Sequence, residues 1–337
     1  MSRIEDAIIA FLSTGQGQAV AVCLGVAVFL FALIFMGVRH SDEDDYEEEE
    51  ETVEDRRVSD EDYERRQRSI MTVMTMGGIT LTVVAVMMAY PSVYSYLHAR
   101  AVYSQTKSSY TQDISASVDS EGEREITGEV SEYHSVDVDS APSWMTLDVD
   151  FESLVQENSD IIGWLVVDGI DIINYPIVQA DDDSYYLTHS FTGEENSSGA
   201  IFLAAGSSPD FIDAYSIIYG HNMKDGSMFG SLKKFEREES SFDVRATGFT
   251  IYTAGHAYRY RIFSYCTLKS DDEIYSLGFT NGTDEFSDLV DRLFSASERY
   301  VDLSPDTNSR IVTLSTCSYS DSVRFTVHGM LMEVYDY

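Results

Sequence analysis

The sequence has few basic residues, with 22 Lys and Arg against 58 Asp and Glu, so its 337 residues carry a formal net charge of −36. A protein that binds a phosphate backbone needs clustered Lys and Arg, so this balance argues against a nucleic-acid partner. Cysteine is also scarce, with three in the chain and no CxxC pair. This count excludes the disulfide framework of a small secreted domain and a cysteine-rich metal site.

Charged residues are missing from two long apolar runs, residues 19–38 and residues 70–90. A helix needs ~20 apolar residues to cross a ~30 Å hydrocarbon core. The sequence therefore predicts two transmembrane helices after a short N-terminal segment, residues 1–18. A cleavable signal peptide does not fit the first run, because that run is too long and a second one follows.

The segment between the runs, residues 39–69, is acidic overall. Positive charge nevertheless lies close to both predicted helix ends. The residues concerned are Arg39, Arg65, Arg66 and Arg68. The positive-inside rule weighs Lys and Arg near a span and gives acidic residues little weight. We therefore expect a two-pass protein of the cell membrane, with a cytoplasmic acidic loop and an extracellular C-terminal part.

The C-terminal part divides in two by composition. Residues 91–142 are polar and aperiodic, which is typical of an extracellular stalk.

From residue 143 to residue 337 the sequence changes to short β-rich runs separated by turns. The pair Asp168-Gly169 separates two such runs and indicates a hairpin. Helices are expected at 148–158, 228–235 and 284–295, and further strands at 200–203, 216–219, 247–253, 257–268, 310–316 and 323–334. Many strands with sparse helices predict a mostly-β barrel or sandwich.

The cysteines indicate where chemistry could occur. Cys23 lies inside the first apolar run and Cys266 inside a strand pattern, where free cysteine usually behaves as a small buried hydrophobe. Cys317 differs, because it ends the apolar strand IVTLSTC and a polar turn follows it. A thiol at such a strand end is open to a substrate. With no obvious disulfide partner outside the membrane, Cys317 is the candidate nucleophile.

A cysteine nucleophile needs a proton-transfer partner and a group that stabilises the developing oxyanion. His221 follows the apolar run SIIYG and so lies at a strand-to-loop edge, whereas His328 lies inside a strand and is expected to be structural. Ser315 and Cys317 share one face of their strand by alternation. If the last strand pairs with it, Arg324 can reach the thiol. The residues alone leave open whether the three groups meet in space.

Several motifs resemble those of sortases. TLSTC at 313–317 followed by RFTVH at 324–328 is similar to the catalytic signature of that family. The resemblance to class B sortases covers nearly all of residues 151–334. The other matching motifs follow in the expected order: NSDIIGW at 158–164, YPIVQ at 175–179, YYL at 185–187, YGHNM at 219–223 and GSMF at 226–229.

The resemblance implies a sortase β-barrel of about eight strands, with an N-terminal helix and a helix before the last strands, here 284–295. It implies Cys317 as nucleophile, His221 as general acid/base, Arg324 as oxyanion stabiliser and Ser315 as an assisting residue. It implies neither a cofactor nor a metal. Class B enzymes usually have one membrane anchor, whereas this sequence predicts two.

The reaction that the resemblance implies is transpeptidation through a thioester. Its partners are exported proteins with a C-terminal sorting motif and an amine of a peptidoglycan precursor, and its product is a protein fixed to a Gram-positive cell wall. Three alternatives remain open. A Cys-His peptidase or hydrolase would use water as acceptor, a pilin-polymerising sortase would use a lysine of another protein, and a non-catalytic membrane-anchored binding module would require the Cys/His/Arg set to be coincidental.

Overall fold

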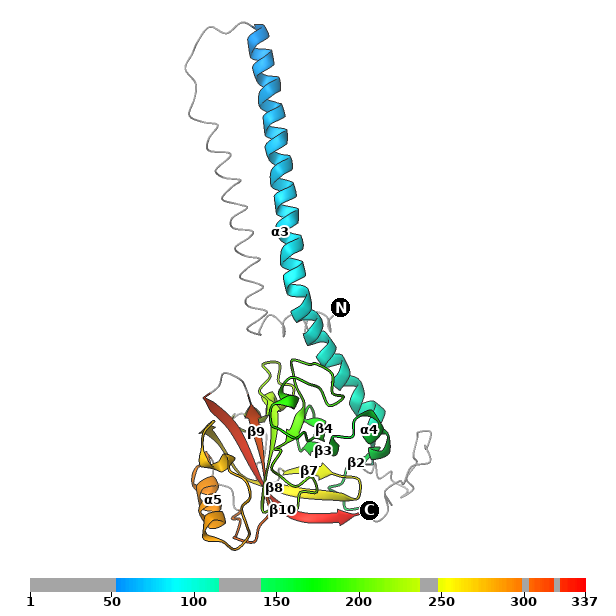
Figure 1. Ribbon diagram of the computed structural model, residues 1–337, viewed down its shortest axis with the longest axis vertical. Helices are drawn as coiled ribbons and strands as arrows, with labels where there is room; N and C mark the ends of the chain where they lie inside the picture. The colour runs from blue at the N-terminus through cyan, green and yellow to red at the C-terminus, as the bar shows by residue number, and fades with distance from the viewer. Residues whose placement is uncertain (1–52, 115–140, 237–247, 299–302, 318–321) are drawn as a thin grey trace, which may run out of the picture. The chain divides into compact units, whose positions relative to one another are not determined.

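The computed structural model describes residues 53–114, 141–236, 248–298, 303–317 and 322–337 (Figure 1). The chain divides into two compact units, Met1–Leu97 and His98–Tyr337. The first predicted span, residues 19–38, lies outside the described residues. The second unit begins well before residue 143, the predicted start of the outer domain.

A long helix, α3 (Val53–Tyr110), contains the second predicted span. Its stretch Tyr63–Tyr90 is apolar and long enough to cross a membrane, and no other helix in the described part of the chain is. The helix begins within the predicted acidic loop, residues 39–69, so the described end of that loop is helical. Near the start of this stretch, the Arg68 guanidinium lies 2.6 Å from the Glu64 carboxylate. Oppositely charged side chains four residues apart favour a helix, so this pair contributes to the helical structure here.

The end of α3 corrects a second prediction, the aperiodic stalk at residues 91–142. Val102, Thr106 and Tyr110 recur every four residues, so they share one face of the helix. Thr106 is 4% exposed, and Val102 and Tyr110 pack against the core of the second unit. After the helix, β1 (Thr111–Asp113) pairs antiparallel with β2 (Leu147–Val149). The described beginning of the expected stalk is therefore part of the folded domain. The segment is polar on average, so its composition does not reveal that one face of the helix packs on the core.

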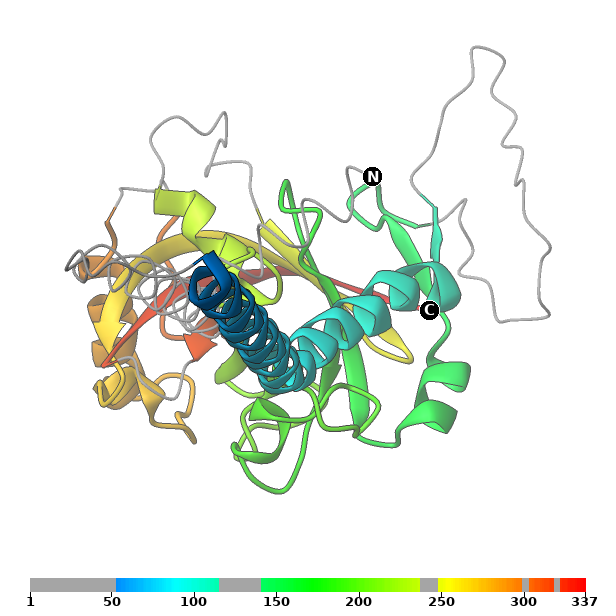
Figure 2. The same cartoon turned by 90° about the horizontal axis from the view of Figure 1, so that it is seen from above.

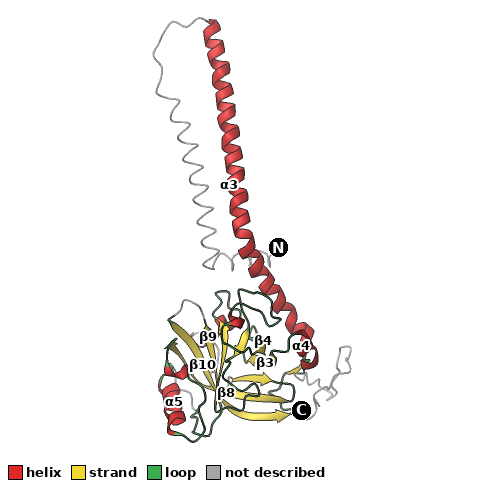
Figure 3. Ribbon diagram, viewed as in Figure 1, coloured by secondary structure: helices red, strands yellow, loops and turns green. Residues whose placement is uncertain are grey.

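A closed barrel of eight strands forms the body of the second unit, which confirms the predicted mostly-β barrel (Figure 3). Most neighbouring strands are antiparallel, but β4 pairs parallel with β5, and β6 pairs parallel with β9. Around the barrel the order is β10 (Val323–Asp336), β8 (His256–Lys269), β7 (Gly248–Tyr252), β3 (Ile161–Val167), β4 (Asn174–Val178), β5 (Ile201–Leu203), β6 (Tyr215–His221) and β9 (Ile311–Cys317). The two long strands β8 and β10 cross the domain together (Figure 2).

The predicted hairpin at Asp168-Gly169 is present, since β3 and β4 are antiparallel neighbours. Gly169 has φ 68°, a conformation that glycine adopts without a steric penalty. The loop is longer than a two-residue turn, because β4 starts only at Asn174.

The helices of the second unit are short. In α5 (Asp284–Ser295) the Thr283 hydroxyl accepts a hydrogen bond from Phe286 N, which caps the helix start. One stripe of α5 is buried, and α5 lies against the outside of the barrel beside β8 (Figure 1). The predicted helix at 228–235 is a 3-10 helix, η2 (Phe229–Glu236). The others are α4 (Phe151–Glu157), η1 (Tyr185–Leu187) and η3 (Glu273–Tyr275).

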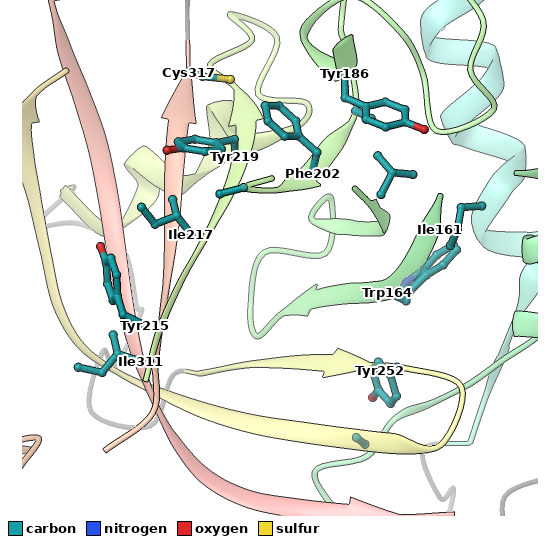
Figure 4. Packing of buried hydrophobic residues seen from close by; sticks show 14 of the residues in the cluster. Ile161, Trp164, Tyr186, Phe202, Tyr215, Ile217, Tyr219, Tyr252, Ile311 and Cys317 are labelled. Carbon is teal, nitrogen blue, oxygen red and sulfur yellow. The ribbon is translucent and has the colours of Figure 1, made fainter. Parts of the chain in front are cut away.

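Two buried clusters lie on opposite faces of the barrel strands. Ile218 and Leu314 belong to one cluster, whereas Ile217 and Cys317 belong to the other, as side-chain alternation requires. The second cluster also contains Phe286 of α5, so it covers the outer face of the barrel. Figure 4 shows part of this outer cluster, with Cys317 at one end of it.

We predict that residues 98–337 fold without the preceding part and that residues 143–337 are less stable. The shorter fragment loses β1, its ladder to β2 and the packing of Val102 and Tyr110 on the core. Burying one large apolar side chain is worth roughly 1.5–3 kcal/mol, so the loss should lower the melting temperature by several degrees. Thermal unfolding of both purified fragments, followed by circular dichroism, measures this. Equal melting temperatures would show that residues 98–114 do not stabilise the domain.

Candidate active site

The parallel pairing of β6 with β9 places the last residues of both strands at the same edge of the barrel. His221 ends β6, Cys317 ends β9, and the two are register partners. Because side chains alternate along a strand, His221 lies on the same face as Tyr219, and Cys317 lies beside them on the outer face. The structure thus brings together two predicted site residues that are 96 positions apart.

The imidazole of His221 is held between two carbonyl oxygens. Its Nε2 lies 2.7 Å from the Leu187 carbonyl oxygen, and its Nδ1 lies 3.2 Å from the Cys317 carbonyl oxygen and 3.9 Å from the Cys317 Sγ. A carbonyl oxygen only accepts, and the Leu187 oxygen is the nearer of the two, so we assign the hydrogen of the neutral ring to Nε2. Nδ1 is then the free base beside the thiol. When the ring is protonated, Nδ1 can donate to the Cys317 carbonyl.

Cys317 is more enclosed than the sequence predicts, with 5% of its surface exposed. Burial raises the pKa of this thiol to about 12, and the nearby Arg324 charge opposes that rise. The thiol is therefore protonated at neutral pH in this state. A thiolate would have to form by proton transfer to an adjacent base, and Nδ1 of His221 is placed to accept that proton.

Arg324 reaches the site from β10, the strand next to β9. Thr326 pairs with Ser315 in the antiparallel ladder, and continuing that register by two residues brings Arg324 opposite Cys317. The Nε atom of Arg324 is buried and has no hydrogen-bond partner among the residues that the structure describes. Most buried donors are satisfied, so a free one beside a nucleophile is available to a developing oxyanion.

Two tyrosine rings hold the guanidinium of Arg324. Its Cζ lies 5.6 Å from the centroid of the Tyr219 ring and 5.0 Å from that of Tyr275, within the range of a cation–π contact. The two rings stack with centroids 6.4 Å apart. The Tyr275 hydroxyl in turn lies 3.1 Å from the Ser315 Oγ. Ser315 thus contacts the site through Tyr275.

Neither tyrosine was predicted from the sequence to be a site residue. Tyr219 could have been found, because it lies two residues before His221 and so faces the same side of β6. Tyr275 carries no such signal, since it comes from η3 in the connection between β8 and α5. Only the folded chain brings this connection over the ends of the barrel strands.

A second cysteine–histidine pair lies apart from the site. The Cys266 Sγ is 3.5 Å from the His328 Nε2, and both residues are buried, as the sequence predicts. The ring nitrogens of His328 lie 2.8 Å and 2.9 Å from the hydroxyl oxygens of Thr313 and Thr326. Burial lowers the pKa of His328 to about 3 and raises the pKa of Cys266 to about 11. Both groups are therefore neutral near pH 7 and act as packing residues.

The described part of the chain contains no group of three or more His, Cys, Asp or Glu side chains placed to hold a metal ion. The chemistry that these residues can perform is that of a cysteine nucleophile with a neighbouring imidazole base and a cationic hydrogen-bond donor.

We predict that the charge of Arg324 lowers the pKa of the Cys317 thiol. Arg324→Met removes the charge and keeps an apolar stem, so the pKa should rise by roughly one pH unit, whereas Arg324→Lys should raise it less. The rate of iodoacetamide alkylation of Cys317 at increasing pH, read by mass spectrometry of its peptide, measures the pKa. If Arg324→Met left the midpoint of the rate profile unchanged, the guanidinium would not act on the thiol.

Comparison with known proteins identifies the family of the chain. A sequence model of the sortase domain matches residues 165–332. The sortase B of Listeria monocytogenes is 28% identical over 242 residues, which are 71% of this chain and 87% of that protein. The structure of sortase B from Bacillus anthracis in complex with AAEK2 is 35% identical, with 55% of this chain and 83% of that chain covered and a TM-score of 0.50. A Staphylococcus aureus sortase B–substrate complex is 27% identical, with 55% and 85% covered and a TM-score of 0.51. These matches confirm the resemblance that the motifs indicate, and the chain belongs to the sortase family.

Proposed function

We propose that the protein cleaves a C-terminal sorting motif of exported proteins and joins the acyl part to an amine of a peptidoglycan precursor. Sortases are cysteine transpeptidases, and the relatives found here are class B members. The observation that best supports the proposal is the approach of the Cys317 Sγ to the His221 Nδ1, at 3.9 Å.

The first half-reaction makes a thioester. Nδ1 of His221 takes the thiol proton, and the Cys317 sulfur attacks the carbonyl carbon of the scissile amide. Arg324 Nε–H donates to the oxygen on which negative charge develops. The protonated His221 then gives its proton to the leaving amine, the C–N bond breaks, and the acyl group remains on the sulfur.

The second half-reaction reverses these roles. The incoming amine attacks the thioester carbonyl, and Nδ1 of His221 accepts the proton that the amine loses. The C–S bond breaks, the thiolate leaves, and the proton passes back to sulfur. One amide replaces another, so the thioester conserves the energy of the cleaved bond.

The enclosure of Cys317 supports transfer rather than hydrolysis. Only 5% of the Cys317 surface is exposed, so the residue has little contact with bulk water, and an acyl group on its sulfur would shield it further. Water competes with the amine only where it reaches the thioester carbonyl. Product analysis separates the two outcomes, because hydrolysis gives a free acid and transfer gives a new amide.

We also propose that the protein is anchored in the cell membrane by two helices, residues 19–38 and 70–90, with the catalytic domain outside. The apolar stretch Tyr63–Tyr90 of α3 supports the second of these spans. Arginines next to both runs support a cytoplasmic position for the connecting segment, residues 39–69. An exported substrate also requires an extracellular active site.

Substitution of the three site residues should cause different failures. Cys317→Ala removes the sulfur and should abolish both thioester and transfer product. His221→Ala should lower the rate by about 10²–10⁴-fold, the usual contribution of general acid–base catalysis. Arg324→Lys should lower it by roughly 10²-fold or more, because it loses the Nε donor and the planar geometry. The assay uses the full chain in detergent, a library of sorting-motif peptides and an added amine, with mass spectrometry of enzyme and products.

Cys266→Ala is the matched control in this assay. It removes a buried thiol outside the site and should change stability more than turnover. The proposal fails if Cys266→Ala abolishes transfer in a folded protein while Cys317→Ala retains it. A product that is only the free acid, even at high amine concentration, would indicate a hydrolase.

Topology can be read from protease protection. A protease that cannot cross the membrane, added to intact cells, should remove residues 98–337 and spare residues 39–69. The reason is the arginine placement that predicts a cytoplasmic loop. Antibodies against a tag in each region measure the result. Cleavage of the loop with protection of the domain would reverse the proposed orientation.

A further inference from the structure

Tyr103 connects helix α3 to the loop that follows η1. Its hydroxyl donates to the Gly199 carbonyl oxygen at 2.6 Å and accepts from the Phe191 backbone N–H at 3.4 Å. Its ring packs edge-on against Tyr175, with centroids 5.4 Å apart, and at a tilt against Phe191, at 5.7 Å. The side chain is therefore fixed both by its ring and by its hydroxyl, and one hydroxyl bridges two points of the same loop.

Gly199 in turn lies against the groups that hold His221. It has φ +59°, and a Cβ at this position would lie 3.0 Å from the His221 Cδ2, 3.0 Å from the Leu187 carbonyl oxygen and 2.5 Å from the Tyr186 carbonyl oxygen. The next residue, Ala200, donates its backbone N–H to that Tyr186 carbonyl at 2.9 Å. The chain at Gly199 thus lies close to η1 and to the imidazole, with no room for a side chain between them.

The Leu187 carbonyl is the group that orients the ring, through its 2.7 Å approach to the His221 Nε2. We propose that Tyr103 is a positioning residue for His221: by holding Gly199 it holds the η1 backbone, whose Leu187 carbonyl directs Nδ1 toward Cys317. This inference rests on the proposed function, because it concerns how the general acid/base is held. Tyr103 touches neither the thiol nor the imidazole, so its effect on catalysis is indirect.

A purely structural role for Tyr103 would have different consequences. It would lower the free energy of unfolding and would change kcat, KM and the alkylation rate of Cys317 whether or not His221 is present. A positioning role changes the efficiency of proton transfer and leaves peptide binding nearly constant. It also depends on the presence of His221, since nothing is positioned when the imidazole is absent.

The first test compares Tyr103→Phe with the wild type, using the full chain in detergent. Phenylalanine keeps the ring contacts and removes only the hydroxyl. We expect kcat for peptide cleavage to fall about three- to tenfold, the size of effect that one neutral hydrogen bond gives, with KM changed less than about twofold. The control is Tyr110→Phe on the same helix, whose ring packs on the core. It should keep the wild-type kcat.

The second test needs no substrate motif. Iodoacetamide alkylation of Cys317 is measured in four proteins: wild type, Tyr103→Phe, His221→Gln and the double variant. We expect Tyr103→Phe to slow alkylation about threefold or more when His221 is present and to have no effect in the His221→Gln background. Circular dichroism at the assay temperature establishes that each protein is folded.

Equal slowing in both backgrounds would overturn the inference, as would an alkylation rate and kcat unchanged by Tyr103→Phe. Failure of the proposed function gives a different result. In that case no peptide forms an acyl-enzyme on Cys317 in the wild type, while the alkylation comparison still decides whether Tyr103 acts through His221.

Discussion

The parallel pairing of β6 with β9 is the constraint on which the site depends. Two antiparallel neighbours would place their C-terminal residues at opposite edges of the barrel, whereas parallel neighbours end at the same edge. His221 and Cys317 can therefore both be the last residue of a strand and still be register partners. Arg324 then comes from the start of β10, which is antiparallel to β9 and begins where β9 ends. Three strand termini thus define the site before any loop contributes to it.

A buried thiol with a high pKa is a poor nucleophile by itself, and the surroundings of Cys317 compensate for this in two ways. The imidazole beside it can take the proton, and the guanidinium lowers the pKa of the thiol. The tyrosine pair contacts the guanidinium of Arg324, and its Nε has no hydrogen-bond partner in the described part of the chain. A cation on aromatic faces keeps its charge in place without using up its hydrogen-bond donors. In the proposed acyl transfer, burial protects the sulfur from water, and the Arg324 guanidinium keeps a donor for the developing negative charge.

Much of this architecture could be predicted from residue patterns. Strand alternation and turn residues located the barrel strands to within a few residues, with β4 starting four residues later and β6 ending two residues later than expected. Polar residues after apolar runs indicated His221 and Cys317 as candidates. Contacts between segments that are distant in the sequence could not be predicted from these patterns. Nothing local marks Tyr275 as a partner of Arg324, because η3 reaches the site only through the fold. The packing face of α3 was missed for a related reason, since Val102, Thr106 and Tyr110 lie in a stretch whose overall composition is polar.

The bond between the Leu187 carbonyl and the His221 Nε2 has a consequence for the order of events. With Nε2 occupied, every proton that the imidazole exchanges must pass through Nδ1. In the proposed reaction the departing amine and the arriving amine would therefore occupy, one after the other, the same position next to that nitrogen. Two amines cannot occupy it together, so the first product has to diffuse away before the acceptor can enter. The proposed reaction would therefore follow a ping-pong sequence, in which the acyl-enzyme persists after the first amine has left and before the second amine binds.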